Sequence, residues 1–275
     1  MFPDPRVFLP IGVSAKGPTP RCGTTLKKIF AIVHPLYISA MLFVGGTCAG
    51  QDRCNTELKL LLSPAEIQAT VITLKAQKKS SGAVYFFDTE KRELLAQGVI
   101  LRLRRGSTSD LTFKLRLPQS KNFKDPTSGE EKFKCEVDVA ADETSISYSV
   151  RNSFAGRQIP ETGNDIYRAF SKGQLRLLKV ARVVVDWNQV KRVADIEVTD
   201  WQIKSGPQSE KLALELWEWP RGKILELSRK SESESGSKAY EELRKIALNK
   251  GLTLSANQRS KTRMVLEANT TPIKN

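Results

Sequence analysis

The sequence predicts an α+β fold in which a large antiparallel β-sheet closes into a barrel with helices around it. Segments that alternate polar and apolar residues, as strands do, are many, and they do not alternate regularly with helical segments. So many strands are expected to curl, and closure of the sheet would remove its exposed edges. The glycine-rich G-x-G-x-x-G and P-loop patterns are both absent, so a doubly wound nucleotide fold is not expected.

Eight strands and at least three helical segments are predicted along the chain. The strands are expected at 54–62, 83–89, 98–105, 110–118, 131–139, 179–187, 193–201 and 211–220. One helix is expected in LSPAEIQATVITLKAQ, where Ser63 and Glu66 form a capping-box pattern. Another is expected in SKAYEELRKIALNKG, which ends at Gly251. The stretch 142–178 is expected to be partly helical, with Asn164 as a cap before DIYRAFSKG.

The net charge indicates an anionic partner. The chain has 44 Lys and Arg against 30 Asp and Glu, a formal charge of +14, which suits nucleic acid, phosphate ligands or an anionic membrane. Aromatic residues make up only 7%, and no stacking or recognition-helix motif is present, so no specific nucleic-acid partner is expected. The one histidine, His34, lies in an apolar N-terminal stretch. Any metal would therefore bind oxygen ligands, which favours Mg²⁺ or Mn²⁺.

The N-terminal region resembles a secretory leader in its layout. A Lys27-Lys28 pair precedes the apolar run IFAIVHPLYISAMLFV, and small residues follow. We therefore expect a leader over residues 1–50, with a signal peptide at 27–49, and one folded domain over 51–275. The protein is expected to be exported, periplasmic or secreted, and an uncleaved N-terminal membrane anchor is the alternative.

The four cysteines lack the C-x-x-C spacing of zinc sites. Two of them, Cys54 and Cys135, remain if the leader is removed. They either pair in an oxidising compartment or are two unrelated thiols.

Charged residues alternate with apolar ones on several strands, and the sign of the charge differs between strands. The cations are Arg102, Arg104, Lys114 and Arg116, and the carboxylates are Glu136, Asp138, Asp195 and Glu197. A solvated outer face is the usual interpretation of such alternation. Segregation by strand, together with barrel closure, favours a charged interior instead. Such an interior is costly unless a polyanion satisfies the cations and a metal ion satisfies the acids.

Seven segments in order resemble the motifs of the CYTH domain of the triphosphate tunnel metalloenzyme superfamily. They are NTELK, YFFDTEKRELLAQGVILRLRR, LTFKLRLP, KCEVD, KVARVVV, LALELWE and RSKTR, and they span roughly residues 54–266. The first family motif is E-x-E-x-K, and Asn55 replaces its first Glu here. Ala213 stands where the family often has an acid. The resemblance implies an eight-stranded antiparallel tunnel that binds triphosphate-bearing compounds with Mg²⁺ or Mn²⁺.

The resemblance also implies roles for individual residues. Catalytic roles fall to Glu57, Lys59, Arg102 and Arg104. The phosphate-binding set is Lys59, Arg102, Arg104, Lys114, Lys134, Arg182 and Lys261. The metal ligands are Glu57, Glu136, Asp138 and Glu215, and compensation for Asn55 and Ala213 would come from Asp138, Asp195 and Glu197.

Two functions follow from these expectations. The first is metal-dependent hydrolysis of inorganic triphosphate or of an organic triphosphate. The alternative is a catalytically impaired module of the same fold that binds polyphosphate or a related anion. In both cases the partner is a triphosphate-containing small molecule or polyphosphate, and a membrane is contacted only through the N-terminus.

Overall fold

The computed structural model describes residues 54–118, 133–141, 143–204, 212–231 and 236–269. The predicted leader, residues 1–50, lies outside this part of the chain. The strands are β1 (Asn55–Leu62), β2 (Gln77–Asp88), β3 (Val99–Arg105), β4 (Asp110–Pro118), β5 (Phe133–Val139), β6 (Thr144–Ser153), β7 (Lys191–Ile203), β8 (Leu212–Trp219) and β9 (Gly222–Ser231). The helices are η1 (Pro64–Glu66), α1 (Ile67–Thr73), α2 (Glu93–Ala96), α3 (Gly163–Arg168), α4 (Lys172–Val180), α5 (Gly236–Asn249) and α6 (Lys261–Ala268).

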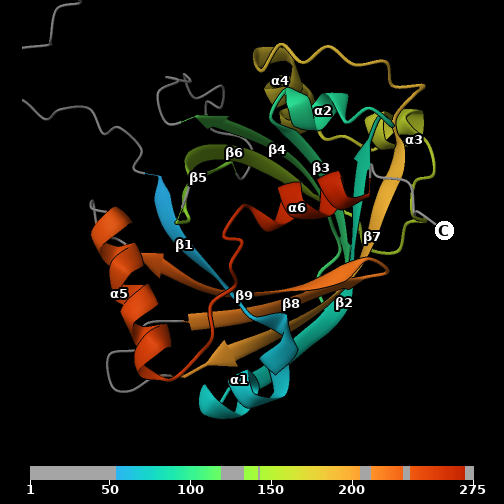
Figure 1. Cartoon of the computed structure of the whole chain (residues 1–275). Helices are drawn as coiled ribbons and strands as arrows, with labels where there is room; N and C mark the ends of the chain where they lie inside the picture. Colours follow the sequence, from blue (N-terminus) through green and yellow to red (C-terminus); the bar gives the residue numbers. More distant parts are fainter. Residues whose placement is uncertain (1–53, 119–132, 142, 205–211, 232–235, 270–275) are drawn as a thin grey trace, which may run out of the picture. The chain divides into compact units, whose positions relative to one another are not determined.

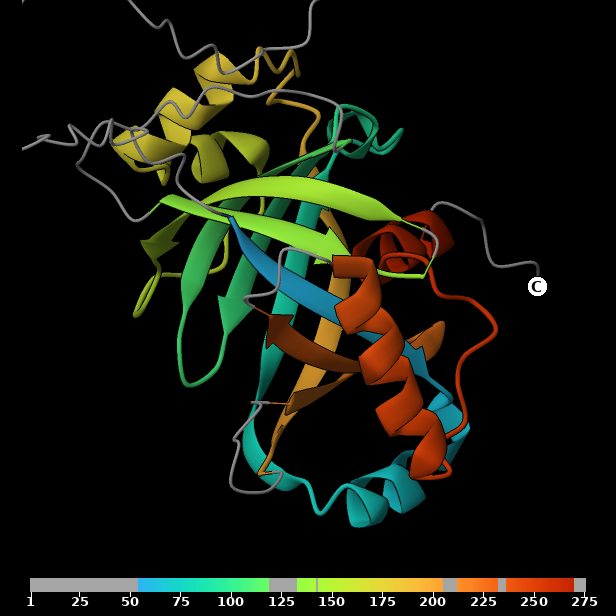
Figure 2. The ribbon, with the colours of Figure 1, turned by 90° about the vertical axis from the view of Figure 1, so that its left-hand side faces the viewer.

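The strands close into a barrel, as predicted. Their order around the barrel is β1-β5-β6-β4-β3-β2-β7-β8-β9 (Figures 1 and 2). The described chain thus forms nine strands where eight were expected, and one neighbouring pair is parallel. β1 closes the barrel, because it pairs antiparallel with β9 on one side and parallel with β5 on the other.

Three local predictions were wrong. Residues 179–187 do not form a strand. The end of α4 occupies part of that range, and a capping box between Ser171 and Gln174 starts this helix. β6 and β9 were not predicted. The N-cap of α3 is Thr162, whose hydroxyl accepts a hydrogen bond from the Asp165 amide at 3.2 Å, and Asn164 lies inside the helix.

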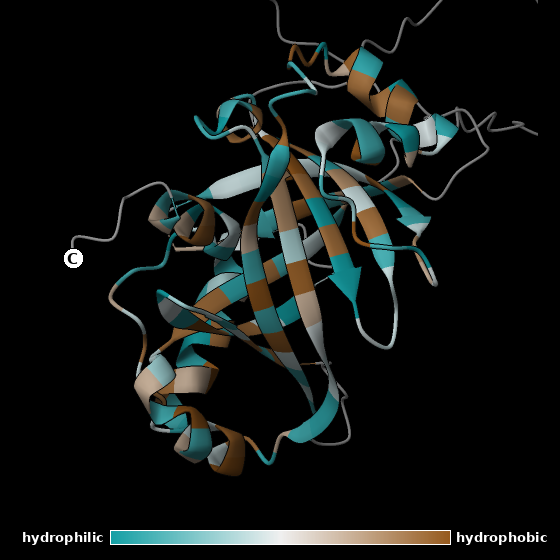
Figure 3. Cartoon of the chain, turned by 90° about the vertical axis from the view of Figure 1, so that its right-hand side faces the viewer, coloured by the Kyte–Doolittle hydropathy of each residue, from teal (hydrophilic) through white to brown (hydrophobic). Residues whose placement is uncertain are grey.

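Helices cover the outer face of the barrel over two apolar clusters. One cluster combines Leu58 and Leu60 of β1 with Tyr240 and Leu243 of α5, and α5 lies beside β1 in Figures 1 and 2. The other lies on β3, β4 and β6, where Leu177 of α4 packs. Bands of apolar and polar residues alternate along the strands in Figure 3, as expected when neighbouring side chains point to opposite faces.

A third apolar cluster fills part of the barrel interior. Phe86, Ile196 and Trp217 pack there with Val265 and Leu266 of α6. In Figure 1 this helix lies across the opening of the ring of strands, and Figure 2 shows it at one end of the barrel. The interior is therefore divided into an apolar part beside α6 and a polar part, which contains the candidate site.

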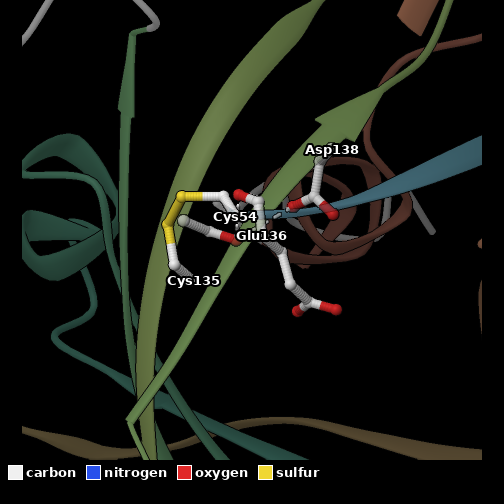
Figure 4. Close-up of a disulfide and its surroundings, with 5 residues drawn as sticks. Cys54, Cys135, Glu136 and Asp138 are labelled. Carbon is white, nitrogen blue, oxygen red and sulfur yellow. Dashed lines mark hydrogen bonds between the residues drawn. A yellow bond between two sulfur atoms is a disulfide. The ribbon is translucent and has the colours of Figure 1, made fainter. Parts of the chain in front are cut away.

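A disulfide joins Cys54 to Cys135 across the parallel strand pair, with their Cα atoms 4.7 Å apart (Figure 4). This selects the paired alternative over two unrelated thiols. The next residues along, Asn55 and Glu136, face each other in the β1–β5 register. The bond therefore fixes the register of the two strands that close the barrel.

None of the helices in the described ranges has both the length and the apolar character of a membrane span.

Candidate anion-binding site

A cavity of about 720 Å³ lies inside the barrel. Its walls carry eleven basic side chains and seven acidic ones, a surplus of four positive charges. The basic residues are Lys59, Lys79, Arg102, Arg104, Lys114, Arg116, Lys134, Arg151, Lys230, Arg259 and Lys261, and the acidic ones are Glu57, Glu136, Asp138, Glu143, Asp200, Glu215 and Glu226. The charged faces of β1, β3, β4 and β5 thus point inward, as the segregation of charge predicted.

The structure brings together ten of the eleven predicted site residues. Those that line the cavity are Glu57, Lys59, Arg102, Arg104, Lys114, Lys134, Glu136, Asp138, Glu215 and Lys261. Arg182 does not line it. This residue lies in the turn after α4, with a left-handed φ of 52°, because the expected strand at 179–187 is absent.

The expected compensation from Asp195 and Glu197 is also wrong. Both side chains are exposed on β7, where they alternate with the buried Ala194, Ile196 and Val198. The residue of β7 that does bring a carboxylate to the cavity is Asp200.

Asp138 is the centre of a set of ion pairs. Its carboxylate contacts Lys59 Nζ at 2.5 Å, Lys114 Nζ at 3.2 Å and Arg116 Nη2 at 3.2 Å. The Ser147 hydroxyl donates to it at 3.3 Å. Burial alone would raise the pKa of Asp138, but the three cations hold that pKa well below its usual range.

The other two carboxylates of β1 and β5 are paired as well. Glu136 contacts Lys134, and Lys114 Nζ lies 3.8 Å from it. Glu57 lies 3.3 Å from Lys59 Nζ. Burial lowers the pKa of Lys114 to about 8, and the attraction of Asp138 only partly offsets this.

Lys261 joins two further carboxylates. Its ammonium contacts Glu215 and lies 2.7 Å from Glu226 Oε1. The same nitrogen lies 4.6 Å from the centre of the Trp217 ring, within the range of a cation–π contact. Burial raises the pKa of Glu226 to about 7, against the attraction of Lys59.

We call all these paired groups the ion-pair network. It comprises the cations Lys59, Lys114, Arg116, Lys134 and Lys261, and the acids Glu57, Glu136, Asp138, Glu215 and Glu226.

A second group of cations, Arg102, Arg104 and Arg151, differs from the network, and we call it the arginine wall. Arg102 faces Thr112 across β3 and β4, and Thr112 faces Arg151 across β4 and β6. No carboxylate of the described residues forms an ion pair with any of the three, and Arg102 Nε is buried without a hydrogen-bond partner. Burial lowers the pKa of Arg102 to about 9. Repulsion from Arg104 and Arg151 adds to the effect, and attraction by Asp110 and Glu136 partly offsets it.

Sequence reasoning gave no site role to eight charged residues that the structure places in the cavity, and three of them belong to the network or the wall. Arg116 was seen as a strand cation, but nothing in the sequence links it to Asp138. Arg151 and Glu226 lie on β6 and β9, the two strands that were not predicted. Glu226 has one local signal, a charge flanked by apolar residues in Leu225-Glu226-Leu227, and Arg151, between Val150 and Asn152, lacks even this.

The carboxylates are oxygen donors of the kind that Mg²⁺ and Mn²⁺ prefer, but their arrangement does not form a metal site. No group of three or more acidic, histidine or cysteine side chains is placed to hold a metal ion within the described ranges. Each of the four predicted ligands instead contacts a lysine or arginine. Mg²⁺ or Mn²⁺ therefore stays a prediction from the sequence.

No family model and no curated protein matches this sequence, but solved structures do. HpAC1 from Hippeastrum, a candidate adenylyl cyclase with a dominant triphosphatase activity, aligns at a TM-score of 0.55 and 16% identity, over 79% of this chain and 98% of that one. A candidate adenylate cyclase from Bacillus halodurans aligns at 0.51 and 14% identity, over 77% and 97%. At such identities the likeness concerns the fold. The chain has the CYTH-like, triphosphate tunnel fold that its motifs predict.

Proposed function

We propose that the barrel binds the phosphate chain of a triphosphate-containing small molecule or of polyphosphate. The arginine wall is the observation that supports this most strongly. The three guanidinium groups share one wall, and among the described residues no carboxylate forms an ion pair with them. Arg104 and Arg151 repel Arg102, the attraction of Asp110 and Glu136 offsets this in part, and a bound anion would relieve the remaining repulsion. Guanidinium groups donate paired hydrogen bonds that match phosphate oxygens.

The spread of the cations favours a chain of phosphates over a single anion. Arg102 and Arg104 lie on β3, Arg151 on β6, and Lys79 and Lys230 on β2 and β9, and all five face the same cavity. Cations on four different strands offer a chain of phosphates several separate points of contact. The cavity volume of about 720 Å³ is typical of a small-molecule pocket, so the site suits a short linear polyanion and not a nucleic-acid duplex.

Hydrolysis of the bound chain with Mg²⁺ or Mn²⁺ is a second proposed function. The likeness to HpAC1, which has a dominant triphosphatase activity, favours it. The predicted catalytic residues Glu57, Lys59, Arg102 and Arg104 share the cavity. We derive no step through a metal, because the carboxylates do not converge on one.

The disulfide between Cys54 and Cys135 supports an exported location, since such bonds persist in oxidising compartments. We therefore propose that the anion is met outside the cytoplasm. Inorganic triphosphate and polyphosphate fit that setting better than ATP does.

One experiment tests binding and hydrolysis together. The full-length protein is titrated calorimetrically with tripolyphosphate, with orthophosphate and with single-stranded DNA, and phosphate release is followed with Mg²⁺ or Mn²⁺. Tighter binding of tripolyphosphate than of orthophosphate or DNA would support the proposed phosphate-chain site. Release of phosphate would in addition support hydrolysis. Absence of tripolyphosphate binding, or equal binding of DNA, would overturn the proposal.

A further inference from the structure

Glu215 and Glu226 form an unusual pair inside the barrel. They face each other directly in the β8–β9 register, and both line the cavity. Like charges opposite each other on neighbouring strands destabilise a sheet, and more so where water is scarce. A cation beside the two carboxylates, or protonation of Glu226, relieves this repulsion.

The chain supplies that cation itself. Lys261, the first residue of α6, places its ammonium against both carboxylates and over the Trp217 ring. The ammonium thus lies where a divalent ion bridging the two acids would have to lie.

The anchoring of α6 fixes the backbone of Lys261 beside the two carboxylates. The Arg116 guanidinium donates to the Ser260 hydroxyl at 2.6 Å, just before the helix. Near its other end, Arg92 Nε donates to the Leu266 carbonyl at 3.2 Å, and Arg221 Nη1 donates to the Ala268 carbonyl at 2.7 Å. With both ends of α6 bonded to the barrel, Lys261 stays within reach of the two carboxylates, and a metal ion would have to compete with the ammonium for them.

The acids of β1 and β5 are neutralised in the same manner. Asp138 has three cationic partners, and Glu57 and Glu136 have at least one each. A hard divalent ion needs several oxygen ligands that are free to coordinate it. Asn55 and Ala213 add no charge at the two positions where the family motifs carry acids.

We propose that Lys261, with the other cations of the ion-pair network, takes the place of divalent metal, so that the tunnel binds its phosphate chain without a metal ion. This inference rests on the proposed phosphate binding. The carboxylates then balance the network, and the surplus positive charge, including the arginine wall, is left for the anion.

The full-length protein is titrated with tripolyphosphate in EDTA and again in Mg²⁺, with correction for the magnesium complex of the ligand. We expect dissociation constants that agree within about threefold. Binding that requires Mg²⁺, or tightens more than about tenfold with it, would overturn the inference and leave phosphate binding intact. Absence of binding in both conditions would instead overturn the proposed function, and the inference with it.

A second measurement follows the metal directly. Electron paramagnetic resonance of Mn²⁺ should show no stoichiometric binding to the wild-type protein. Lys261→Gln leaves Glu215 and Glu226 without their cation and should gain a Mn²⁺ site. Lys223→Gln, which removes the exposed partner of Glu218 at 2.6 Å, is the matched control and should gain none.

Stoichiometric Mn²⁺ binding by the wild type would refute the inference, whether or not the Lys261 variant folds. A folded Lys261→Gln protein that binds no more Mn²⁺ than the Lys223 control would refute it as well.

Discussion

The arginine wall and the ion-pair network lie in the same cavity on neighbouring strands, but their charged groups differ in whether they have ion-pair partners. In the network each acid is in contact with a cation, and Asp138 alone has three cationic partners. In the wall, no carboxylate of the described residues forms an ion pair with the three arginines, and two guanidinium groups repel the third, Arg102. The comparison suggests that the network holds the barrel together and that the wall binds the ligand.

Buried ion pairs add little stability compared with apolar packing, but loss of one partner is expensive. In an unpaired cluster of like charges, loss of one member does not lower the stability in this way, because it relieves repulsion. Substitutions in the two regions should therefore have opposite signatures. Those in the wall should change affinity for tripolyphosphate, and those in the network should change the free energy of unfolding.

The largest effect is expected for the double variant Arg102→Gln/Arg104→Gln. Hydrogen bonds to charged groups contribute about 1.5–3 kcal/mol each, so tripolyphosphate affinity should fall at least about a hundredfold. Calorimetric titration measures this. Arg105→Gln, on the same strand but stacked on Phe154 outside the main cavity, should bind as the wild type does. Equal losses in the two proteins would mean that the wall is not the binding surface.

Asp138→Asn tests the network. The change leaves Lys59, Lys114 and Arg116 without the carboxylate that they share, and a broken buried pair costs about 3–5 kcal/mol. Denaturant unfolding should show this loss. Asp195→Asn removes an exposed carboxylate 3.4 Å from Arg192 and should cost less than about 1 kcal/mol. The contrast between network and wall is wrong if these two losses are equal.

Reduction of the disulfide should act on stability alone. Cys54 and Cys135 are 81 residues apart in the chain, and loss of the bond should lower the free energy of unfolding by about 2–4 kcal/mol. Cys54→Ser, Cys135→Ser and the double variant should lose the same amount, because each removes one and the same bond. A double variant that loses about twice as much would indicate that the thiols act separately.

The smallest effect concerns pH. The pKa of Lys114 is about 8 in the free protein, and a bound phosphate chain would raise it. Well below pH 8 the Lys114 ammonium is already present, so the affinity does not vary with pH through this group. Above pH 8 binding takes up a proton, and affinity should fall by up to about tenfold per pH unit until the pKa of the complex is reached.

Lys114→Arg keeps the charge throughout this range and should remove that part of the slope. Dissociation constants are measured for both proteins between pH 7 and 9.5. The difference between the two slopes gives the contribution of Lys114, because protonation of the ligand affects both proteins equally. Identical slopes would show that Lys114 does not titrate in the binding range.

Much of the cavity could be predicted because several strands alternate charge with apolar residues. Lys59, Arg102, Lys114 and Glu136 occupy such positions on β1, β3, β4 and β5, and all four point inward. A period of two is a local property, so one sequence suffices to detect it.

The remaining parts depend on partners far away in the chain. β6 turns Ser145, Ser147 and Ser149 toward the network, where they are buried, and serines give no clear signal of facing inward. Glu226 sits between two leucines, and its importance depends on Glu215 and Lys261. The error at Arg182 arose because a valine-rich run favours a strand, whereas the capping box at Ser171 begins a helix that runs to Val180.

The position of β1 affects how the protein folds. This first strand of the barrel meets the last one, so that Thr56 faces Ser231, and pairings between residues so distant in the chain form slowly. Until that seam closes, Glu57 and Lys59 remain hydrated at an open edge, and the cavity does not exist. Closure is thus the step at which these side chains lose water, and we expect the rate-limiting phase of refolding to depend on ionic strength.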